Sequence, residues 1–151
     1  MCGSKHRVGK MSKKNTLVSL ILAVLGVVDS TYLLIYKISK NNAMCLGNGD
    51  CATVNASRYS EIYGIPVSLL GILAYLAIVV VLILGLRKMI NPDNSNLIVF
   101  GLSLVGVIFS AYLTYIEFFV IYAVCPFCII SAVIITLIFI FSIIQFMNSS
   151  K

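Results

Sequence analysis

Residues 125–147 read CPFCIISAVIITLIFIFSIIQFM, two cysteines separated by two residues and followed by a long apolar run. A bilayer core of roughly 30 Å is crossed by about 20 apolar residues in an α-helix. Pro126 suits the first turn of such a helix, because the N–H that proline lacks has no intrahelical partner there. This stretch therefore predicts a transmembrane helix that begins with a CxxC motif.

Three more apolar stretches predict the rest of the fold. The chain has 151 residues, of which 60% are hydrophobic and 11% charged, and its mean hydropathy is +1.06. This composition is typical of a protein whose solvent is lipid, and it leaves no room for a large soluble domain. We predict an all-α membrane protein with a basic tail at residues 1–16 and a four-helix transmembrane bundle at residues 17–147. The predicted helices cover about residues 17–36, 65–86, 97–120 and 126–147.

The basic residues predict how the bundle is oriented. Five lysines and arginines and no acidic residue precede the first helix, and Arg87 and Lys88 lie between the second and third helices. Cytoplasmic loops are enriched in such residues. The basic residues of the loop at 37–63 share it with Asp50 and Glu61 and carry less weight. Both termini are therefore expected in the cytoplasm (N-in, C-in), with the first loop extracytoplasmic. The net charge of +6 reflects this topology rather than nucleic-acid binding, because no basic and aromatic stripe is present.

In this topology four cysteines gather on the extracytoplasmic side, where disulfides persist. Cys45 and Cys51 lie in the glycine-rich first loop, which can close a small ring, and Cys125 and Cys128 begin the last helix. A thiol at a helix N-terminus is more reactive, because the free N–H groups and the positive end of the helix dipole stabilise its thiolate. Two dithiols at one rim suggest a relay by thiol–disulfide exchange. The fifth cysteine, Cys2, lies on the opposite side and is assigned no role.

Other readings of the four cysteines stay open. The protein could be a non-catalytic membrane protein with two structural disulfides, although a structural bridge rarely needs a CxxC at the start of a helix. The four thiols could form a zinc clip, but the spacing of the loop pair is wide for a zinc knuckle and no histidine assists, so we predict no metal. Buried inert thiols are a third reading. The redox relay accounts for the pattern best.

Two halves of the chain resemble one another at an offset of 80 residues. The offset aligns Gly26 with Gly106 and Ser30 with Ser110, and it brings Cys45 onto Cys125. Both halves would run in the same direction through the membrane, as in repeats related by an axis along the membrane normal. Chance matching between apolar helices is the alternative. The small residues of this pattern would serve close helix packing under either reading.

Over about residues 17–145 the chain resembles the vitamin K epoxide reductase family. The resemblance rests on a loop cysteine pair that precedes a CxxC, and on short motifs around them. These are Ser57 six positions after Cys51, GIPVSLLG at 64–71, FFV at 118–120 and CPFC at 125–128. The last motif looks more like microbial members of the family than vertebrate ones.

The resemblance implies a four-helix bundle around a quinone of the menaquinone or ubiquinone type, in the plasma membrane of a microbe. It implies that Cys128 gives electrons to the quinone, and that Cys125 is linked alternately to Cys128 and to Cys51. Cys45 would meet a thioredoxin-like extracytoplasmic oxidase. The implied function is a thiol:quinone oxidoreductase that reoxidises this partner and so supports disulfide bond formation.

Three departures from the family pattern qualify the expectation. Only five residues separate Cys45 from Cys51, fewer than in animal members. The polar quinone contacts of vertebrate members fall on Val67 and Ala132, whose side chains cannot donate hydrogen bonds. A vitamin K quinone or epoxide reductase is therefore the alternative rather than the first choice. The chain ends at Lys151 without the fused thioredoxin-like domain of many bacterial relatives, so we expect a separate partner.

Four polar residues complete the candidates. Asp29 lies inside the first helix, where a charge costs at least about 2.5–3.5 kcal/mol, so it either delivers protons to the quinone or is a neutral, hydrogen-bonded acid. Ser57 and Tyr59 are predicted in a short lid helix, either hydrogen-bonding near the quinone or serving as an ordinary cap and interfacial anchor. Glu117, nearer the outer surface, is expected to be a polar group of the bundle or its interface.

Overall fold

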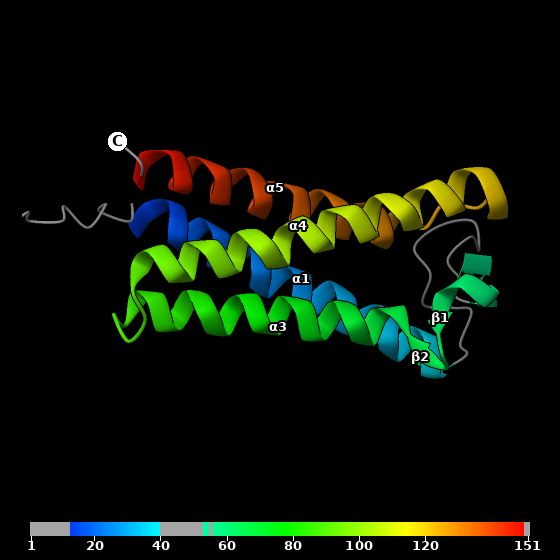
Figure 1. Ribbon diagram of the computed structural model, residues 1–151. Coiled ribbons are helices and arrows are strands. Elements are labelled where there is room, and N and C mark those ends of the chain that lie inside the picture. The colour runs from blue at the N-terminus through cyan, green and yellow to red at the C-terminus, as the bar shows by residue number, and fades with distance from the viewer. Residues whose placement is uncertain (1–12, 40–52, 55, 150–151) are drawn as a thin grey trace, which may run out of the picture.

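Four long helices lie side by side in the computed structural model, which describes residues 13–39, 53–54 and 56–149. They are α1 (Lys13–Ser39), α3 (Val67–Leu86), α4 (Pro92–Ile116) and α5 (Pro126–Ser149). The helix α1 packs mainly against α3 and α5, and α4 packs mainly against α5 (Figure 1). The predicted four-helix bundle is confirmed.

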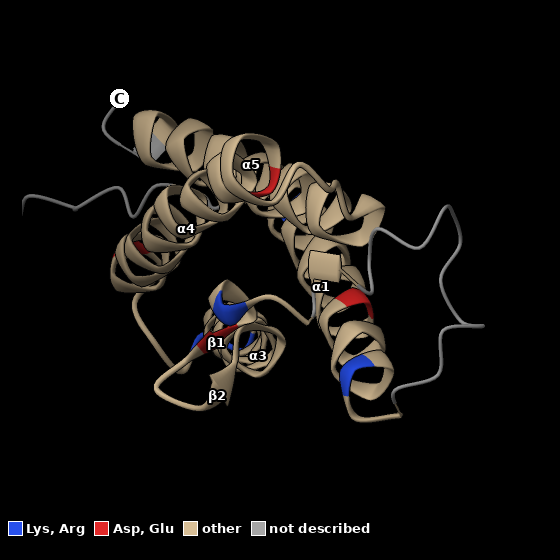
Figure 2. Cartoon of the chain, turned by 90° about the vertical axis from the view of Figure 1, so that its right-hand side faces the viewer, with Lys and Arg blue, Asp and Glu red and all other residues tan. Residues whose placement is uncertain are grey.

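The outer surface of the bundle suits a membrane. All four helices are long and apolar enough to span a bilayer, within the part of the chain that is described. Large apolar side chains such as Val28, Val105 and Ile108 are more than 60% exposed in the isolated chain. Most of the helix length carries no charged residue (Figure 2). Such a surface would be unfavourable in water, and it matches a lipid environment.

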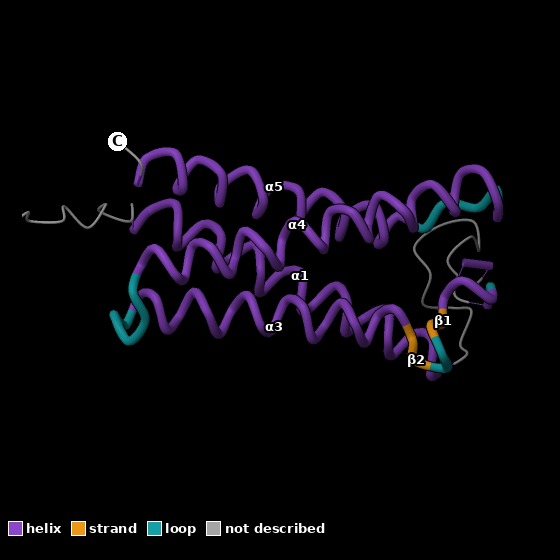
Figure 3. The backbone as a smooth tube through the Cα atoms, in the orientation of Figure 1, coloured by secondary structure: helices purple, strands orange, loops and turns teal. Residues whose placement is uncertain are grey.

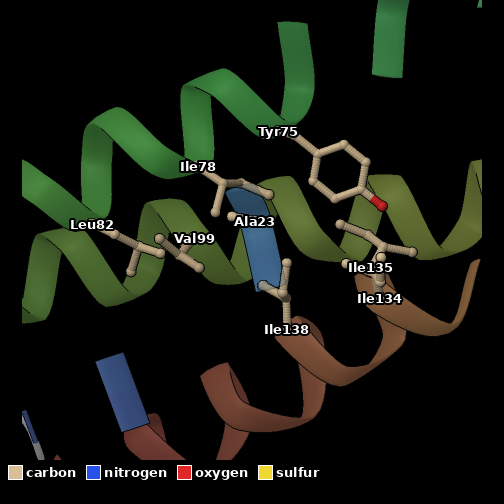
Figure 4. Close-up of a cluster of buried hydrophobic side chains, with 8 residues drawn as sticks. All are labelled: Ala23, Tyr75, Ile78, Leu82, Val99, Ile134, Ile135 and Ile138. Carbon is tan, nitrogen blue, oxygen red and sulfur yellow. The ribbon is translucent and has the colours of Figure 1, made fainter. Parts of the chain in front are cut away.

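The interior is a narrow apolar core to which all four helices contribute (Figure 4). Ala23 in α1, Ile78 in α3 and Ile138 in α5 have no exposed surface. Small residues allow the close approach of helices that packing in lipid requires. A Cβ atom at Gly26 would lie 2.5 Å from the ring of Tyr75 in α3.

The glycine that the 80-residue offset pairs with Gly26 has a corresponding position. A Cβ atom at Gly106 in α4 would lie 2.8 Å from Cγ1 of Ile135 in α5. In each half, a large side chain of the second helix therefore packs against the glycine of the first helix.

Two helices begin before the apolar runs that predicted them. The helix α1 begins at Lys13 rather than near residue 17, and α4 begins at Pro92 rather than near residue 97. Pro92 and Asp93 favour the first turn of α4, and the Ser95 hydroxyl donates a 3.2 Å hydrogen bond to a carbonyl of α3. Hydropathy marks the membrane-crossing part of a helix, so it misses such polar first turns.

A small hairpin precedes α3 at one end of the bundle (Figure 3). The strands β1 (Glu61–Ile62) and β2 (Ile65–Pro66) pair antiparallel. Tyr63 and Gly64 between them have φ values of 53° and 81°, as the two central residues of a tight type I′ turn require. Because residues 65–66 belong to this hairpin, α3 begins at Val67.

Candidate redox site and its cavity

The connection between α4 and α5 is unusual. After Ile116 the helix continues as one π-helical segment, η3 (Glu117–Ile121), and Tyr122 then adopts a left-handed conformation with φ 54°. The backbone N–H of Tyr122 donates to the carbonyl of Glu117, which makes the π-turn, and the N–H of Ala123 donates to the same carbonyl at 3.2 Å. Single π-turns within helices occur frequently at functional sites.

This turn leads directly into the CxxC motif at the start of α5. Cys125 is fully buried and directly precedes Pro126, and its carbonyl accepts a 3.2 Å hydrogen bond from the N–H of Ile129. Cys128 follows on the first turn and is half-buried. The side chains of the two cysteines are hydrogen-bonded to each other. The motif thus begins the helix and holds its two sulfur atoms within bonding reach.

The helix α1 covers the buried cysteine. Leu33 and Tyr36 of α1 pack against Cys125 in a small cluster of buried residues. The rings of Tyr32 and Phe127 lie beside it with centroids 4.8 Å apart. Cys125 is therefore enclosed by protein.

Glu117 lies against both cysteines. Its side chain is among the buried ones, with only 3% of the residue exposed. The carboxylate oxygen Oε2 accepts a hydrogen bond of 3.2 Å from the backbone N–H of Cys125, and the carboxylate is also hydrogen-bonded to the Cys128 side chain. Sequence reasoning expected only a polar group of the bundle or interface here. The available signal was an acidic residue in an apolar helix, eight positions before a CxxC.

A cavity of about 430 Å³ opens between the four helices beside this cluster, and its walls are mostly apolar. Cys128 and Glu117 both line it, whereas Cys125 is not among its lining residues. Tyr75 also lines it, and the hydroxyl of Tyr75 donates a 2.9 Å hydrogen bond to the carbonyl of Ser131. The hydroxyl of Ser68, another lining residue, is buried without a hydrogen-bond partner among the described residues. The cavity thus has an apolar body and a few polar groups.

A lid segment (residues 57–60) forms one wall of the cavity. It contains the short helix η2 (Arg58–Ser60), at the place where the sequence predicted a lid helix. The Ser57 hydroxyl does not cap η2, because it donates a 2.6 Å hydrogen bond to the carbonyl of Val54. Lys37 at the end of α1 holds the lid segment in place through a 2.8 Å hydrogen bond to the Ser60 hydroxyl. The lysine also forms a 3.0 Å ion pair with Glu61.

The structure brings some of the predicted quinone contacts to this cavity and leaves others outside it. Ser57, Tyr59 and Val67 are lining residues. Asp29 and Ala132 are not, although Ala132 lies one turn after Cys128 on α5. The Oδ2 atom of Asp29 is buried and has no hydrogen-bond partner in the described part of the chain, so the expected hydrogen bond is not seen at this atom.

The loop cysteines Cys45 and Cys51, and Cys2 in the tail, lie outside the described residues. Within residues 13–39, 53–54 and 56–149, no group of three or more histidine, cysteine or acidic side chains is placed to hold a metal ion.

Two comparisons with known proteins bear on this site. A family model described as the vitamin K epoxide reductase family matches residues 17–143. A relative from Arabidopsis thaliana, named thiol-disulfide oxidoreductase LTO1, is 29% identical over 96 residues. The matched region covers 60% of this chain but only 25% of the relative, so the chain spans about a quarter of that protein's length. Because the family match covers most of the chain, including the CxxC and the helices around the cavity, the chain belongs to the vitamin K epoxide reductase family.

Proposed function

We propose that the protein is an integral-membrane thiol:quinone oxidoreductase. It reoxidises a thioredoxin-like extracytoplasmic partner and passes the electrons through two cysteine pairs to a quinone, which supports disulfide bond formation. The observation that carries the proposal is a largely apolar cavity, open between all four helices, with Cys128 of the CxxC on its wall.

The cavity has the size and chemistry that a quinone headgroup needs. Its volume of about 430 Å³ lies within the usual range for small-molecule sites, roughly 300–1,000 Å³. A quinone presents an apolar ring, two carbonyl acceptors and an apolar tail. Tyr59 and Ser68 line the cavity, and their hydroxyl groups can donate to those carbonyls, whereas the hydroxyl of Ser60 already donates to the carbonyl of Ser57. This apolar site supports a ligand of the menaquinone or ubiquinone type.

The reaction at the cavity is a two-electron oxidation. The thiols of Cys125 and Cys128 join in a disulfide, and the quinone takes up the two electrons and both protons to become a quinol. Thiol–disulfide exchange with Cys51 then returns Cys125 and Cys128 to thiols and leaves Cys45 and Cys51 oxidised. That pair in turn oxidises the dithiol of the partner through a mixed disulfide at Cys45. The steps at the loop pair rest on the sequence motif and the family.

The proposed site lies on the extracytoplasmic side of a microbial plasma membrane, and the arrangement of charges supports that orientation. The lid segment and the α4–α5 connection lie at one end of the bundle, whereas the start of α1 and the α3–α4 turn lie at the other (Figure 1). Lys13 and Lys14 begin α1, and Arg87 and Lys88 form the turn, so basic residues gather at the end opposite the CxxC. The positive-inside rule places that basic end in the cytoplasm.

The test is quinone reduction by the purified protein in lipid nanodiscs, first with a small dithiol and then with a reduced thioredoxin-like protein as donor. We expect Cys128→Ala to abolish quinol formation with either donor, and Cys45→Ala to impair it chiefly with the protein donor. Cys2→Ala is the matched control and should behave as the wild type. Quinol formation that survives Cys128→Ala would refute the proposal. Replacing the quinone by vitamin K epoxide tests the alternative substrate.

A further inference from the structure

The buried carboxyl group of Glu117 goes unused in the relay described above, although it touches the dithiol. It accepts hydrogen bonds from the backbone N–H of Cys125 and from the side chain of Cys128. No lysine or arginine in the described part of the chain forms an ion pair with it. A buried carboxylate without a cation needs such donors to remain ionised. The thiol of Cys128 is one of these donors, so its proton is directed at the carboxylate.

Glu117 also faces the place where the quinone would bind. It lines the same cavity as Cys128, and among the described residues it is the one acidic side chain that does so. Asp29 is not a lining residue, and the hydroxyl of Tyr75 is already hydrogen-bonded to Ser131. A quinone in contact with Cys128 would thus have one acidic group within its own cavity.

The backbone is shaped to present this side chain. Glu117 is the first residue of η3, and its own carbonyl accepts the hydrogen bond from the N–H of Tyr122 that makes the π-turn and a second one from the N–H of Ala123. A π-turn is a rare departure from the α-helix and rotates the residues that follow it relative to the preceding turns. Main chain and side chain of Glu117 therefore both bind the segment that leads into the CxxC.

From this geometry, and resting on the proposed quinone reduction, we infer that Glu117 is a catalytic proton carrier between the Cys128 thiol and the quinone. The carboxylate takes the proton from Cys128 as the sulfur becomes a thiolate. Two electrons then pass from the dithiol to the quinone as the bond between the sulfur atoms of Cys125 and Cys128 forms. Glu117 gives its proton to one quinone oxygen. It then takes up the proton released by Cys125, which does not line the cavity, and gives it to the other oxygen. Dithiol and quinone become disulfide and quinol, and Glu117 ends as it began.

The test measures a single turnover, in which the pre-reduced protein in nanodiscs is mixed with quinone and quinol formation is followed. Glu117→Gln keeps the size of the side chain and an oxygen that can accept the Cys125 hydrogen bond, but it cannot carry a proton. We expect the rate to fall on the order of 10²-fold, as for loss of a general base. Asp93→Asn, the same chemical change at the opposite end of α4, is the matched control and should leave the rate unchanged.

Chemical rescue separates proton transfer from a merely structural role. Glu117→Ala leaves space for a small carboxylic acid, so added formate should restore quinol formation in a concentration-dependent way. A rate for Glu117→Gln within about twofold of the wild type would overturn the inference while leaving the proposed function intact. Equal losses in both variants, with no response to formate, would also overturn it. If the wild type forms no quinol that depends on its cysteines, the proposed function fails and the inference fails with it.

Discussion

Replacing Gly26 in α1 by alanine introduces a methyl group where the helix packs against the ring of Tyr75 in α3. The new Cβ would lie 2.5 Å from Cε1 and 2.6 Å from Cδ1 and Cζ of Tyr75. These atoms belong to a rigid ring, so the ring as a whole has to move. Its hydroxyl is tied to Ser131 in α5 by hydrogen bonds of 2.9 and 3.0 Å to the carbonyl and the side chain. The ring cannot swing aside without breaking them.

The magnitude follows from these two effects. Overpacking a tight core typically costs about 1–3 kcal/mol, and losing a hydrogen bond of this kind costs about 0.5–1.5 kcal/mol. We therefore expect Gly26→Ala to lower the free energy of unfolding by about 1.5–4.5 kcal/mol. Because Tyr75 lines the cavity, the variant should also bind quinone more weakly.

The assay is thermal unfolding of the protein in nanodiscs, combined with quinone titration. Gly101→Ala is the matched control, since a Cβ there would meet nothing within 4 Å, and an alanine in a helix is favoured over glycine by up to about 1 kcal/mol. The double variant Gly26→Ala with Tyr75→Phe should be less unstable than the sum of the single changes, because a ring without its hydroxyl is free to shift. A Gly26→Ala protein as stable as the Gly101→Ala protein would refute the reasoning.

Three further changes test other parts of the site. Ser68→Ala removes a buried hydroxyl without a partner among the described residues, so it should leave thermal stability nearly unchanged. If that hydroxyl binds a quinone carbonyl, the dissociation constant for quinone should rise up to about tenfold. Gly64→Ala places a Cβ atom on a residue with φ 81°, where no other atom lies within 4 Å. The backbone strain alone should therefore lower the free energy of unfolding by about 1–2 kcal/mol. Lys37→Met removes the contacts to Ser60 and Glu61; since the ion pair is partly exposed, stability should fall by less than about 1 kcal/mol. Quinone binding should weaken more noticeably in that variant, and unchanged binding would mean that the lid segment does not need this anchor.

Hydropathy and motif spacing predict the four helices and the place of the CxxC, because both depend on local sequence. A run of about 20 apolar residues needs a helix to satisfy its backbone in lipid, and proline after Cys125 suits a helix start. The π-turn at Glu117 is different in kind. It depends on a bond from the N–H of Tyr122 to the carbonyl of Glu117 rather than to that of Phe118, and no residue type in this segment requires that choice.

The cavity is equally hard to predict, because it is the space left by packing four helices together. A family alignment directs attention to Val67 and Ala132, yet only Val67 lines the cavity. Asp29 stands out in the sequence as a charge within an apolar helix, whereas the acidic residue that lines the cavity is Glu117. A hydropathy profile shows only that an acidic residue lies within an apolar segment. Its role is decided by the side chains that it touches, which belong here to another helix.

In the proposed relay, the placement of the CxxC at the boundary between loop and helix would let one dithiol serve two different electron partners. Its two cysteines are three positions apart, so their backbones differ in height by about 4.5 Å along a helix. Cys125 is enclosed next to Leu33 and Tyr36, at the end of the bundle that the lid segment closes, whereas Cys128 lies on the wall of the cavity between the helices. The first sulfur is therefore on the side from which a loop cysteine would approach, and the second faces a ligand soluble in lipid. A longer spacing would separate the sulfur atoms beyond the reach of a disulfide. A shorter spacing would place both sulfur atoms at the boundary between loop and helix, with neither on the wall of the cavity.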